Sequence, residues 1–214
     1  MRLGTTVTGL KQGKTGVAVT LSDGSREVFD LVVGADGIDS EIRKRILPST
    51  REEYEGLTFW MFWVPKPFKL NEVRYYAGRR KYAAVFPTKG SHFCALFAIP
   101  AREHSYTKQA DVQAFLKEKF AGTGGDVPML LDYLPSKPHA SFHHDDNEVH
   151  ARQWYKGRVV LIGDAAHALS PATGMGASLA MEDAFVLAEE LKRQGSVEEA
   201  LGKYVARRQP RVAF

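Results

Sequence analysis

An aspartate directly follows a short apolar run near the carboxyl end of this chain. The run is Val159–Ile162, and Gly163 and Asp164 come next. In open α/β sheets ligands bind where the strands end, so a carboxylate at this point is well placed to accept hydrogen bonds from hydroxyl groups. The same charge repels phosphate. These residues therefore predict a partner that is rich in hydroxyl groups.

A loop that contains proline and glycine separates this aspartate from a run that favours a helix, over about residues 176–191. Proline restricts the loop backbone, and the glycines let the main chain approach a flat ligand closely. The unpaired N–H groups and the positive dipole end at the start of a helix favour a partly negative atom. An ordinary strand-to-helix crossover is the alternative, but it does not need so many special residues in one order. The expected contacts of this segment are Pro171, Gly174, Gly176, Ala177 and Ser178.

A second apolar run, near the start of the chain, ends in an Asp-Gly turn. Asp36 and Gly37 follow the strand expected over residues 31–34. Ser40 is a suitable N-cap for a helix that contains Arg43. Alone this motif carries little weight, because Asp-Gly turns after strands are common.

Together the two segments resemble the FAD-dependent aromatic hydroxylases, the para-hydroxybenzoate hydroxylase-like monooxygenases. The second flavin motif of that family is an apolar strand, GDAAH, a spaced Pro, Gly-x-Gly-x-Asn-x-Ala and an Asp. Residues 163–183 follow this pattern and end on Asp183, with one departure, Ser178 in place of the usual Asn. The family's Asp-Gly motif matches at Asp36, Gly37, Ser40 and Arg43, and the two motifs have the spacing that the family shows.

The resemblance implies a site for FAD. Asp164 would bind the ribityl chain, and the backbone from Gly174 to Ser178 would face the pyrimidine ring of the flavin. The Asp-Gly motif is associated in the family with the FAD pyrophosphate and with the use of NAD(P)H. His167 is implied to pack and to form hydrogen bonds, and no catalytic acid or base is assigned. The expected cofactor-binding residues are Gly163, Asp164, Pro171, Gly174, Gly176, Ala177, Ser178, Asp36, Gly37 and Arg43.

The activity that the resemblance implies is that of a monooxygenase. NAD(P)H would reduce FAD, and dioxygen would then supply an oxygen atom to an aromatic or other hydrophobic small molecule. Two alternatives stay open, namely a flavin-dependent reductase of the geranylgeranyl reductase type and a catalytically inactive, truncated flavoprotein remnant. The family opens with a G-x-G-x-x-G segment that these 214 residues lack. We therefore expect an N-terminally truncated fragment that binds FAD weakly or not at all, has no NAD(P)H oxidase activity, and aggregates or forms a homodimer through an exposed strand edge.

The elements needed to position these residues predict a mixed α/β fold. A partial Rossmann-like FAD-binding domain is expected over residues 1–53 and 150–214, with an antiparallel β-sheet substrate domain inserted over residues 54–149. The glycines from Gly9 to Gly16 are expected to lie in a turn. Strands over residues 31–34 and 159–162 are apolar enough to be buried on both faces. Further strands are expected over residues 17–21, 26–29, 57–64, 72–77, 81–86 and 93–99, and helices over residues 111–120 and 127–133.

Three side-chain patterns carry further expectations. The helix over residues 176–193 is expected to bury an apolar face made of Ala177, Ala180, Met181, Ala184, Leu187, Ala188 and Leu191. The run His143–Asp146 is expected to be a polar strand end rather than a metal site, because adjacent strand residues point to opposite faces. Strand alternation also lets only about half of the inserted sheet's aromatic side chains face a substrate. These are Phe59, Trp60, Phe62, Trp63, Tyr75, Tyr76, Tyr82, Phe86, Phe93 and Phe97.

Composition argues against several classes of protein. Apolar residues make up 44% and charged residues 25%, as in ordinary globular proteins. The net charge is only +4, and its clusters, Arg43–Arg45, Arg79–Lys81 and Arg207–Arg208, are expected to be solvated, which argues against nucleic acid. No apolar run is long enough for a membrane span. Cys94, the one cysteine, is expected in the core and cannot form an intrachain disulfide, which suits the cytoplasm.

Overall fold

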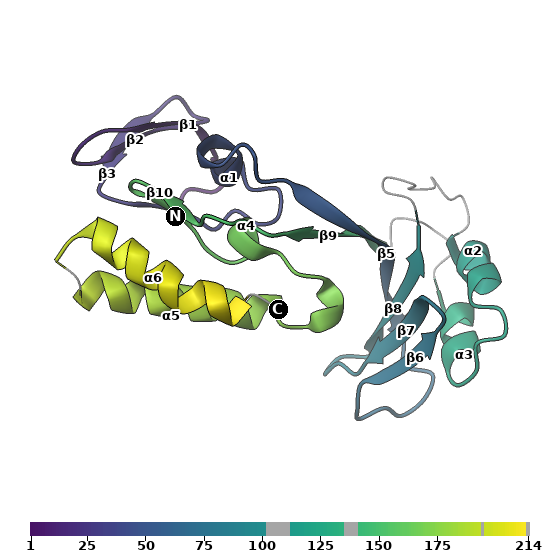
Figure 1. The fold of residues 1–214 in the computed structure, drawn as a ribbon. Coiled ribbons are helices and arrows are strands. Elements are labelled where there is room, and N and C mark those ends of the chain that lie inside the picture. Colours follow the sequence, from purple (N-terminus) through teal and green to yellow (C-terminus); the bar gives the residue numbers. More distant parts are fainter. Residues whose placement is uncertain (102–111, 135–140, 194, 213–214) are drawn as a thin grey trace. The chain divides into compact units, whose positions relative to one another are not determined.

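The computed structural model describes residues 1–101, 112–134, 141–193 and 195–212. The chain divides into two compact units (Figure 1), one of residues 1–53 and 147–214 and the other of residues 54–146. The second division falls between Asp146 and Asn147, whereas the sequence placed it between residues 149 and 150. Each unit has a hydrophobic core of its own.

The first unit opens with an antiparallel sheet of three strands, β1 (Val7–Gln12), β2 (Val17–Leu21) and β3 (Arg26–Phe29). The expectation of a turn over Gly9–Gly16 was wrong in part, because β1 occupies its first half. The turn itself is tight, and the Gly13 N–H donates to the Gly16 carbonyl at 2.8 Å. Apolar and polar residues do not alternate cleanly along β1, so the sequence does not predict a strand there. In the structure several of its residues are exposed.

A second small sheet contains the strands that precede the two motifs. Its order is β10 (Tyr155–Lys156), β11 (Val159–Leu161) and β4 (Val32–Gly34), with β11 and β4 parallel. Every residue of β11 is fully buried, as expected. The same expectation was wrong for β4, where Val33 is 40% exposed because this strand has a neighbour on one side only among the described residues.

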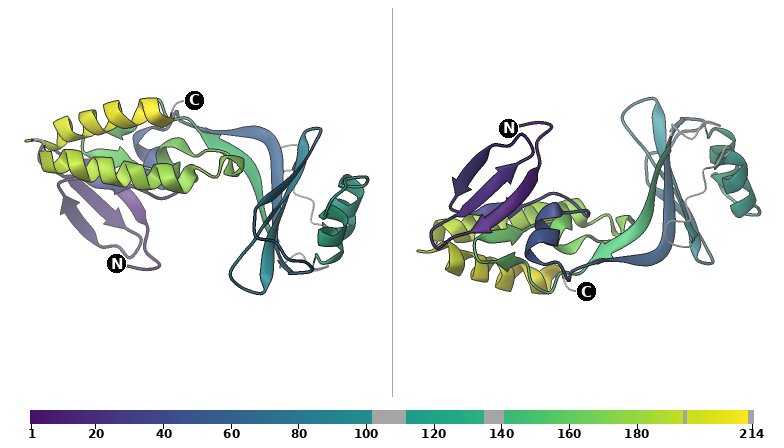
Figure 2. Two further views of the ribbon diagram at one scale, coloured as in Figure 1. Left: turned by 90° about the horizontal axis from the view of Figure 1, so that it is seen from below. Right: turned by 90° about the horizontal axis from the view of Figure 1, so that it is seen from above.

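Two long helices complete the first unit and lie side by side (Figures 1 and 2). They are α5 (Gly176–Arg193) and α6 (Val197–Val212). The apolar face expected for α5 was largely wrong, because Met181 is 66% exposed and Ala177, Ala184 and Ala188 are exposed as well. The helix buries Leu179, Asp183, Val186, Leu187 and Glu190 instead. Arginines of α6 pair with the two acidic side chains, so the buried face of α5 includes charged residues.

The second unit is a five-stranded sheet of order β6-β7-β8-β5-β9 (Figure 2). Its strands are β5 (Glu52–Pro65), β6 (Arg74–Gly78), β7 (Lys81–Phe86), β8 (His92–Pro100) and β9 (Ser141–Val149). Helices α2 (Val112–Lys119) and α3 (Val127–Asp132) cover one face. The helix expected from Asp111 is described from Val112 onward, and Asp111 itself lies outside the described residues.

The aromatic side chains of this sheet divide between its two faces, as alternation predicts. Trp60, Phe62, Phe93 and Phe97 belong to the core beneath α2 and α3, and Tyr76 packs against that core. Phe59, Tyr82 and Phe86 form a separate cluster with Leu96 and Ala98. Tyr75 contacts the rings of Tyr82 and Phe86, while Trp63 is 64% exposed.

Short helices connect the strands to the long helices in the first unit. They are α1 (Glu41–Ile46), α4 (Asp164–His167) and the 3-10 turn η2 (Pro171–Thr173). The predicted N-cap of α1 is confirmed, because Ser40 Oγ accepts a hydrogen bond from the Arg43 N–H at 2.9 Å. None of the helices that the structure describes has the length and apolar character to cross a membrane.

Candidate functional site

A pocket of about 550 Å³ lies in the first unit where the parallel strands β4 and β11 end. Ala35 and Gly37 follow β4, and Gly163 and Asp164 follow β11. A volume of this order holds a small organic molecule or part of a larger one. The other lining residues are Ile162, Leu169, Ser170, Pro171, Gly174, Gly176, Ala177 and Ala180.

The pocket gathers seven of the ten residues that the sequence assigned to cofactor binding. They are Gly37, Gly163, Asp164, Pro171, Gly174, Gly176 and Ala177. Asp36, Arg43 and Ser178 do not line it. The Asp36 carboxylate accepts hydrogen bonds from Ser40 Oγ at 2.5 Å and from the Ile42 N–H at 3.0 Å, so it holds the start of α1. Ser178 is exposed on α5.

Among the described residues that line the pocket, Asp164 is the one with an ionisable side chain. It is exposed at the start of α4, and no hydrogen bond or ion pair ties its carboxylate to the part of the chain that the structure describes. A Cβ added at Gly176 would lie 3.7 Å from Asp164 Oδ1, so the glycine backbone passes close to the carboxylate. The site therefore presents a free acceptor beside a bare stretch of main chain.

Two glycines give the lining its shape. Gly163 has φ +57° and ψ −143°, a conformation that side-chain-bearing residues avoid, and an added Cβ would stand 3.0 Å from the Ala180 Cβ. Gly174 has φ +63°, and an added Cβ there would meet no atom within 4 Å. The first glycine packs strand against helix, and the second leaves open space along the loop.

Asp183 on α5 is fully buried and holds the turn that leads into the pocket lining. Its carboxylate accepts hydrogen bonds from the Gly163 N–H at 2.8 Å, from His167 Nε2 at 2.6 Å and from Arg208 Nε at 2.7 Å. Burial alone raises the pKa of a carboxyl group, but these three donors outweigh it and hold the pKa of Asp183 below its usual value. Because Asp183 is an anion that only accepts, His167 Nε2 carries the shared proton.

His167 has the packing and hydrogen-bonding role that the resemblance implied. The side chain is 4% exposed, and its ring lies 4.7 Å from that of Trp154, measured between centroids. With Nε2 committed to Asp183, the imidazole fixes the end of α4 rather than reaching the pocket lining.

Arg43 connects the two motifs of the sequence. The guanidinium is 1% exposed and donates to the carbonyl oxygens of Ala165 at 3.1 Å and Ile38 at 2.5 Å, and to Glu52 Oε1 at 3.1 Å. Expecting the basic clusters to be solvated was therefore wrong for Arg43 and for Arg208. Both are buried because acceptors from distant parts of the chain surround them.

Other residues singled out by the sequence lie in the second unit. Asp145 accepts a hydrogen bond from Thr58 Oγ1 at 2.7 Å, and the ring of His143 lies 5.6 Å from that of Trp60. Within the described ranges, no three His, Cys, Asp or Glu side chains gather as metal ligands. Cys94 was expected in the core but is only half-buried, and burial raises the pKa of its thiol.

Sequence reasoning did not identify several functional neighbours of the pocket. Ala35, Ile162, Leu169 and Ser170 line it without any chemical signature of their own, whereas Ala180 is the alanine of the matched Gly-x-Gly-x-Asn-x-Ala motif. Asp183 is the last residue of the matched flavin motif, so its position in that motif could have indicated a role at the site. Arg208 had none, because its role depends on the packing of α6 against α5.

Comparison with known proteins identifies the family. Residues 1–213 match the family described as "FAD binding domain". The chain is 33% identical over 214 residues to aurachin C monooxygenase/isomerase of Stigmatella aurantiaca, covering 95% of this chain and 53% of that protein. It is 34% identical over 195 residues to the 2-heptyl-3-hydroxy-4(1H)-quinolone synthase of Pseudomonas aeruginosa, covering 88% and 50%.

Solved structures agree with this match. Klebsiella pneumoniae HpxO complexed with FAD and uric acid superposes with a TM-score of 0.87 at 28% identity, covering 98% of this chain and 55% of that one. The mixed α/β fold expected from the sequence is thereby confirmed. The chain spans about half the length of the curated relatives it matches.

FAD, the cofactor expected from the sequence, is the ligand for which the matched family is named. The relatives include enzymes named as FAD-dependent urate hydroxylases, which agrees with the resemblance drawn from the GDAAH and Asp-Gly motifs. The chain belongs to the FAD binding domain family and, within it, to the FAD-dependent aromatic hydroxylases.

Proposed function

We propose that this protein is an FAD- and NAD(P)H-dependent monooxygenase that hydroxylates an aromatic or other hydrophobic small molecule. The observation that carries the proposal is the free carboxylate of Asp164 in a pocket at the ends of two parallel strands. The relatives support it, because one is named as a quinolone synthase and another as a monooxygenase/isomerase. A solved relative is described with FAD and uric acid bound.

The residues present fit a flavin. Asp164 is an acceptor suited to the hydroxyl groups of the ribityl chain, and its charge does not favour a phosphate. Gly174 and Gly176 leave space and bare backbone for a flat ring. The N-terminus of α5, an 18-residue helix that begins at Gly176, favours negative charge next to it. Bound FAD, once reduced by NAD(P)H, supplies the activation of dioxygen for transfer of one oxygen atom.

Other residues of the first unit fix the positions of Asp164 and of the loop that follows it. The Asp183 carboxylate fixes the Gly163 turn and His167, so the residues around Asp164 keep one arrangement. We assign Asp36 and Arg43 to positioning, because their polar atoms are engaged by α1 and by the main chain. For Ser178 direct contact with the flavin stays a prediction.

We assign residues 1–53 and 147–214 to flavin binding and residues 54–146 to substrate binding. The aromatic side chains of the five-stranded sheet support the second assignment, because rings suit a planar substrate. A cytoplasmic location and a homodimer are part of the same proposal. The free thiol of Cys94 suits a reducing compartment, and the exposed Val33 on the edge strand β4 supports self-association.

The test is oxidation of NADH and NADPH, in the presence of FAD, by these 214 residues joined to the G-x-G-x-x-G segment with which the family opens, with and without hydroxylated aromatic compounds. We expect aromatic compounds to stimulate oxidation and mass spectrometry to find a product with one added oxygen atom. Stimulation only by sugars or by small charged acids would contradict the proposal. Saturation of a substrate double bond without oxygen uptake would indicate a reductase instead.

A further inference from the structure

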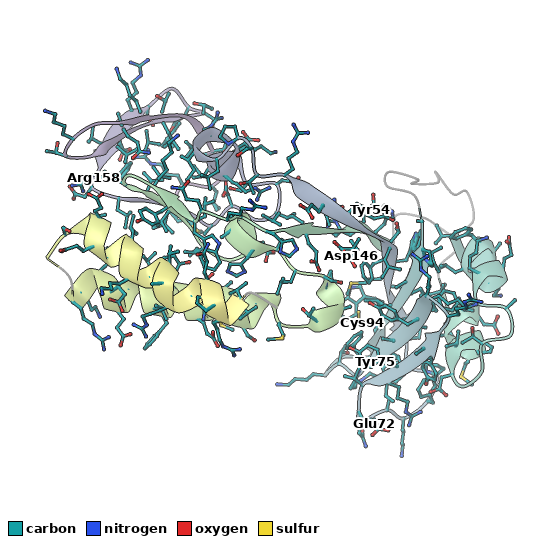
Figure 3. All side chains as sticks on the ribbon, in the orientation of Figure 1. Tyr54, Glu72, Tyr75, Cys94, Asp146 and Arg158 are labelled. Carbon is teal, nitrogen blue, oxygen red and sulfur yellow. The ribbon has the colours of Figure 1, made fainter. Side chains whose placement is uncertain are left out.

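A second pocket, of about 360 Å³, lies in the first unit between the carboxyl-terminal end of α6 and the segment that precedes β10. Figure 3 shows the side chains that fill the space between α6 and the strands of this unit. None of the residues that line the second pocket also lines the pocket that contains Asp164, which we call the flavin pocket. The second pocket is therefore a separate site.

Its lining divides into a buried apolar floor and an exposed polar part. Ala151, Trp154 and Val212 form the floor, and each is less than a tenth exposed. Arg152 and His150 belong to the exposed part, and no hydrogen bond or ion pair engages the Arg152 guanidinium among the described residues. A guanidinium matches the geometry and the charge of a carboxylate. The lining therefore suits a small molecule with an apolar body and one carboxylate group.

The imidazole of His167 also lines this pocket, although it is only 4% exposed. Its Nε2 is bonded to Asp183, whereas its Nδ1 is buried without a hydrogen-bond partner among the described residues. A buried polar atom in this state lowers stability unless a ligand or a bound water engages it. The second pocket thus brings an occupant next to a ring that still has an unused polar atom.

One hydrogen-bonded chain runs from this ring to the flavin pocket. His167 Nε2 lies 2.6 Å from the Asp183 carboxylate, which accepts the Gly163 N–H at 2.8 Å. Gly163 lines the flavin pocket and directly precedes Asp164. A displacement of the His167 ring is therefore passed, through one buried carboxylate, to the turn that carries Asp164.

A second chain begins at the other histidine of the second pocket. His150 Nε2 lies 3.0 Å from Glu148 Oε2, and Glu148 Oε1 accepts the Ser170 N–H at 2.8 Å. Ser170 lines the flavin pocket and is the N-cap of η2, the turn that leads to Gly174. Both histidines of the second pocket thus contact carboxylates that hold main-chain N–H groups of the flavin pocket.

We propose that the second pocket is a regulatory site for a small carboxylate with an apolar body, whose occupancy is coupled to the flavin pocket through these two chains. The carboxylate pairs with Arg152, and the apolar body covers the floor around Trp154. An occupant packed against both imidazoles restricts their motion, and with it the motion of the N–H groups held at the far ends of the chains. Binding here does not depend on the proposed function, although the regulatory meaning rests on it.

The probes are cyclohexylacetate and 2-cyclohexylethylamine, which share an apolar body and carry opposite charges. A body without an aromatic ring keeps them distinct from the substrates of the proposed function. Calorimetric titration of the full chain measures their affinity for the wild type and for Arg152→Met. Arg51→Met is the matched control, because it removes an exposed arginine of the same unit that lines neither pocket.

We expect the wild type and Arg51→Met to bind cyclohexylacetate about fivefold to tenfold more tightly than the amine, the effect of one partly exposed charged pair. Arg152→Met should bind the two probes equally. A wild type that binds neither probe, or a preference that survives in Arg152→Met, would overturn the site.

Hydrogen exchange followed by mass spectrometry tests the coupling. Saturating cyclohexylacetate should slow exchange in the peptides that contain Gly163 and Ser170. His150→Leu should bind the probe and lose the slowing at Ser170 but keep it at Gly163, because only the second chain is cut. Bound probe without slowing at either peptide would overturn the regulatory role.

Titration of FAD, in which Asp164 is the residue tested, is independent of these measurements. Failure of the second pocket leaves that titration unchanged, so it is distinguishable from failure of the proposed function. A chain that binds cyclohexylacetate through Arg152 and ignores FAD would uphold the site and overturn its regulatory role in a flavoenzyme.

Discussion

The guanidinium of Arg43 donates from Nη1 to the main-chain carbonyl of Ala165 at 3.1 Å, and this bond ties the two flavin motifs together. Arg43 lies on α1, just after the turn that contains Gly37, and Ala165 comes directly after Asp164. Both Gly37 and Asp164 line the pocket. The Asp-Gly motif therefore contributes to the site through a buried link as well as through its own turn.

Arg43→Met should destabilise the fold by about 3 kcal/mol, because it leaves buried carbonyl oxygens without their donor. Urea denaturation of the purified chain measures this change. Lys44→Met is the matched control, since this neighbouring side chain is half-exposed and its ion pair among the described residues is with Glu41 on the surface. Equal effects of the two changes would show that the Arg43 link contributes little.

The Asp183 carboxylate makes the first unit sensitive to acid. Its folded pKa is lowered, so it stabilises the protein at pH values above the ordinary carboxyl range near 4. That contribution is lost as the pH falls through the folded pKa. Asp183→Asn should cost roughly 3–5 kcal/mol at neutral pH, because the buried Arg208 loses its counter-charge, and it should flatten the acid limb of the stability curve.

Denaturation between pH 2 and pH 7 tests this dependence. Asp39→Asn serves as the control, because it removes an exposed carboxylate, near the Asp36-Gly37 turn of the same unit. If the acid limb of Asp183→Asn remained as steep as that of the wild type, another carboxylate would be responsible.

The edge of β4 that pairs with no strand among the described residues is expected to mediate self-association. Val33 is 40% exposed there, and unpaired strand edges readily add another strand. Val33→Lys should shift the chain toward monomer in light scattering, because a charge on the edge opposes pairing. The same substitution at Met181, 66% exposed on the helix α5 and away from any strand edge, should leave the mass unchanged. Equal effects at both positions would point to general solubility.

Local order of residue types made much of the site predictable. An apolar strand, a glycine with positive φ, a carboxylate and a helix start are successive features of one segment, so Gly163–Ala177 could be placed together from sequence. The same holds for the Ser40 cap of α1 and for the alternation that divides the aromatic side chains between the faces of the sheet.

Interactions between distant segments were beyond that reasoning. The sequence of α5 shows an apolar stripe that includes Met181, yet the helix turns Asp183 and Glu190 inward. That orientation depends on Arg207 and Arg208 of α6, which offset the cost of burying the carboxylates. The sequence predicted a solvated Arg43 because the acceptors that bury its guanidinium lie far along the chain or in loops, where no local pattern reveals them.

The central claim is that Asp164 binds the hydroxyl-bearing part of the flavin, and its most direct test is a titration of FAD. Flavin fluorescence is followed with these residues joined to the family's G-x-G-x-x-G segment, as the wild type and with Asp164→Ala or Asp39→Ala, the last altering an exposed carboxylate that does not line the pocket. A charged hydrogen bond of about 1.5–3 kcal/mol predicts that Asp164→Ala weakens FAD roughly tenfold to a hundredfold, with Asp39→Ala like the wild type. Equal affinity of Asp164→Ala and the wild type would contradict the account.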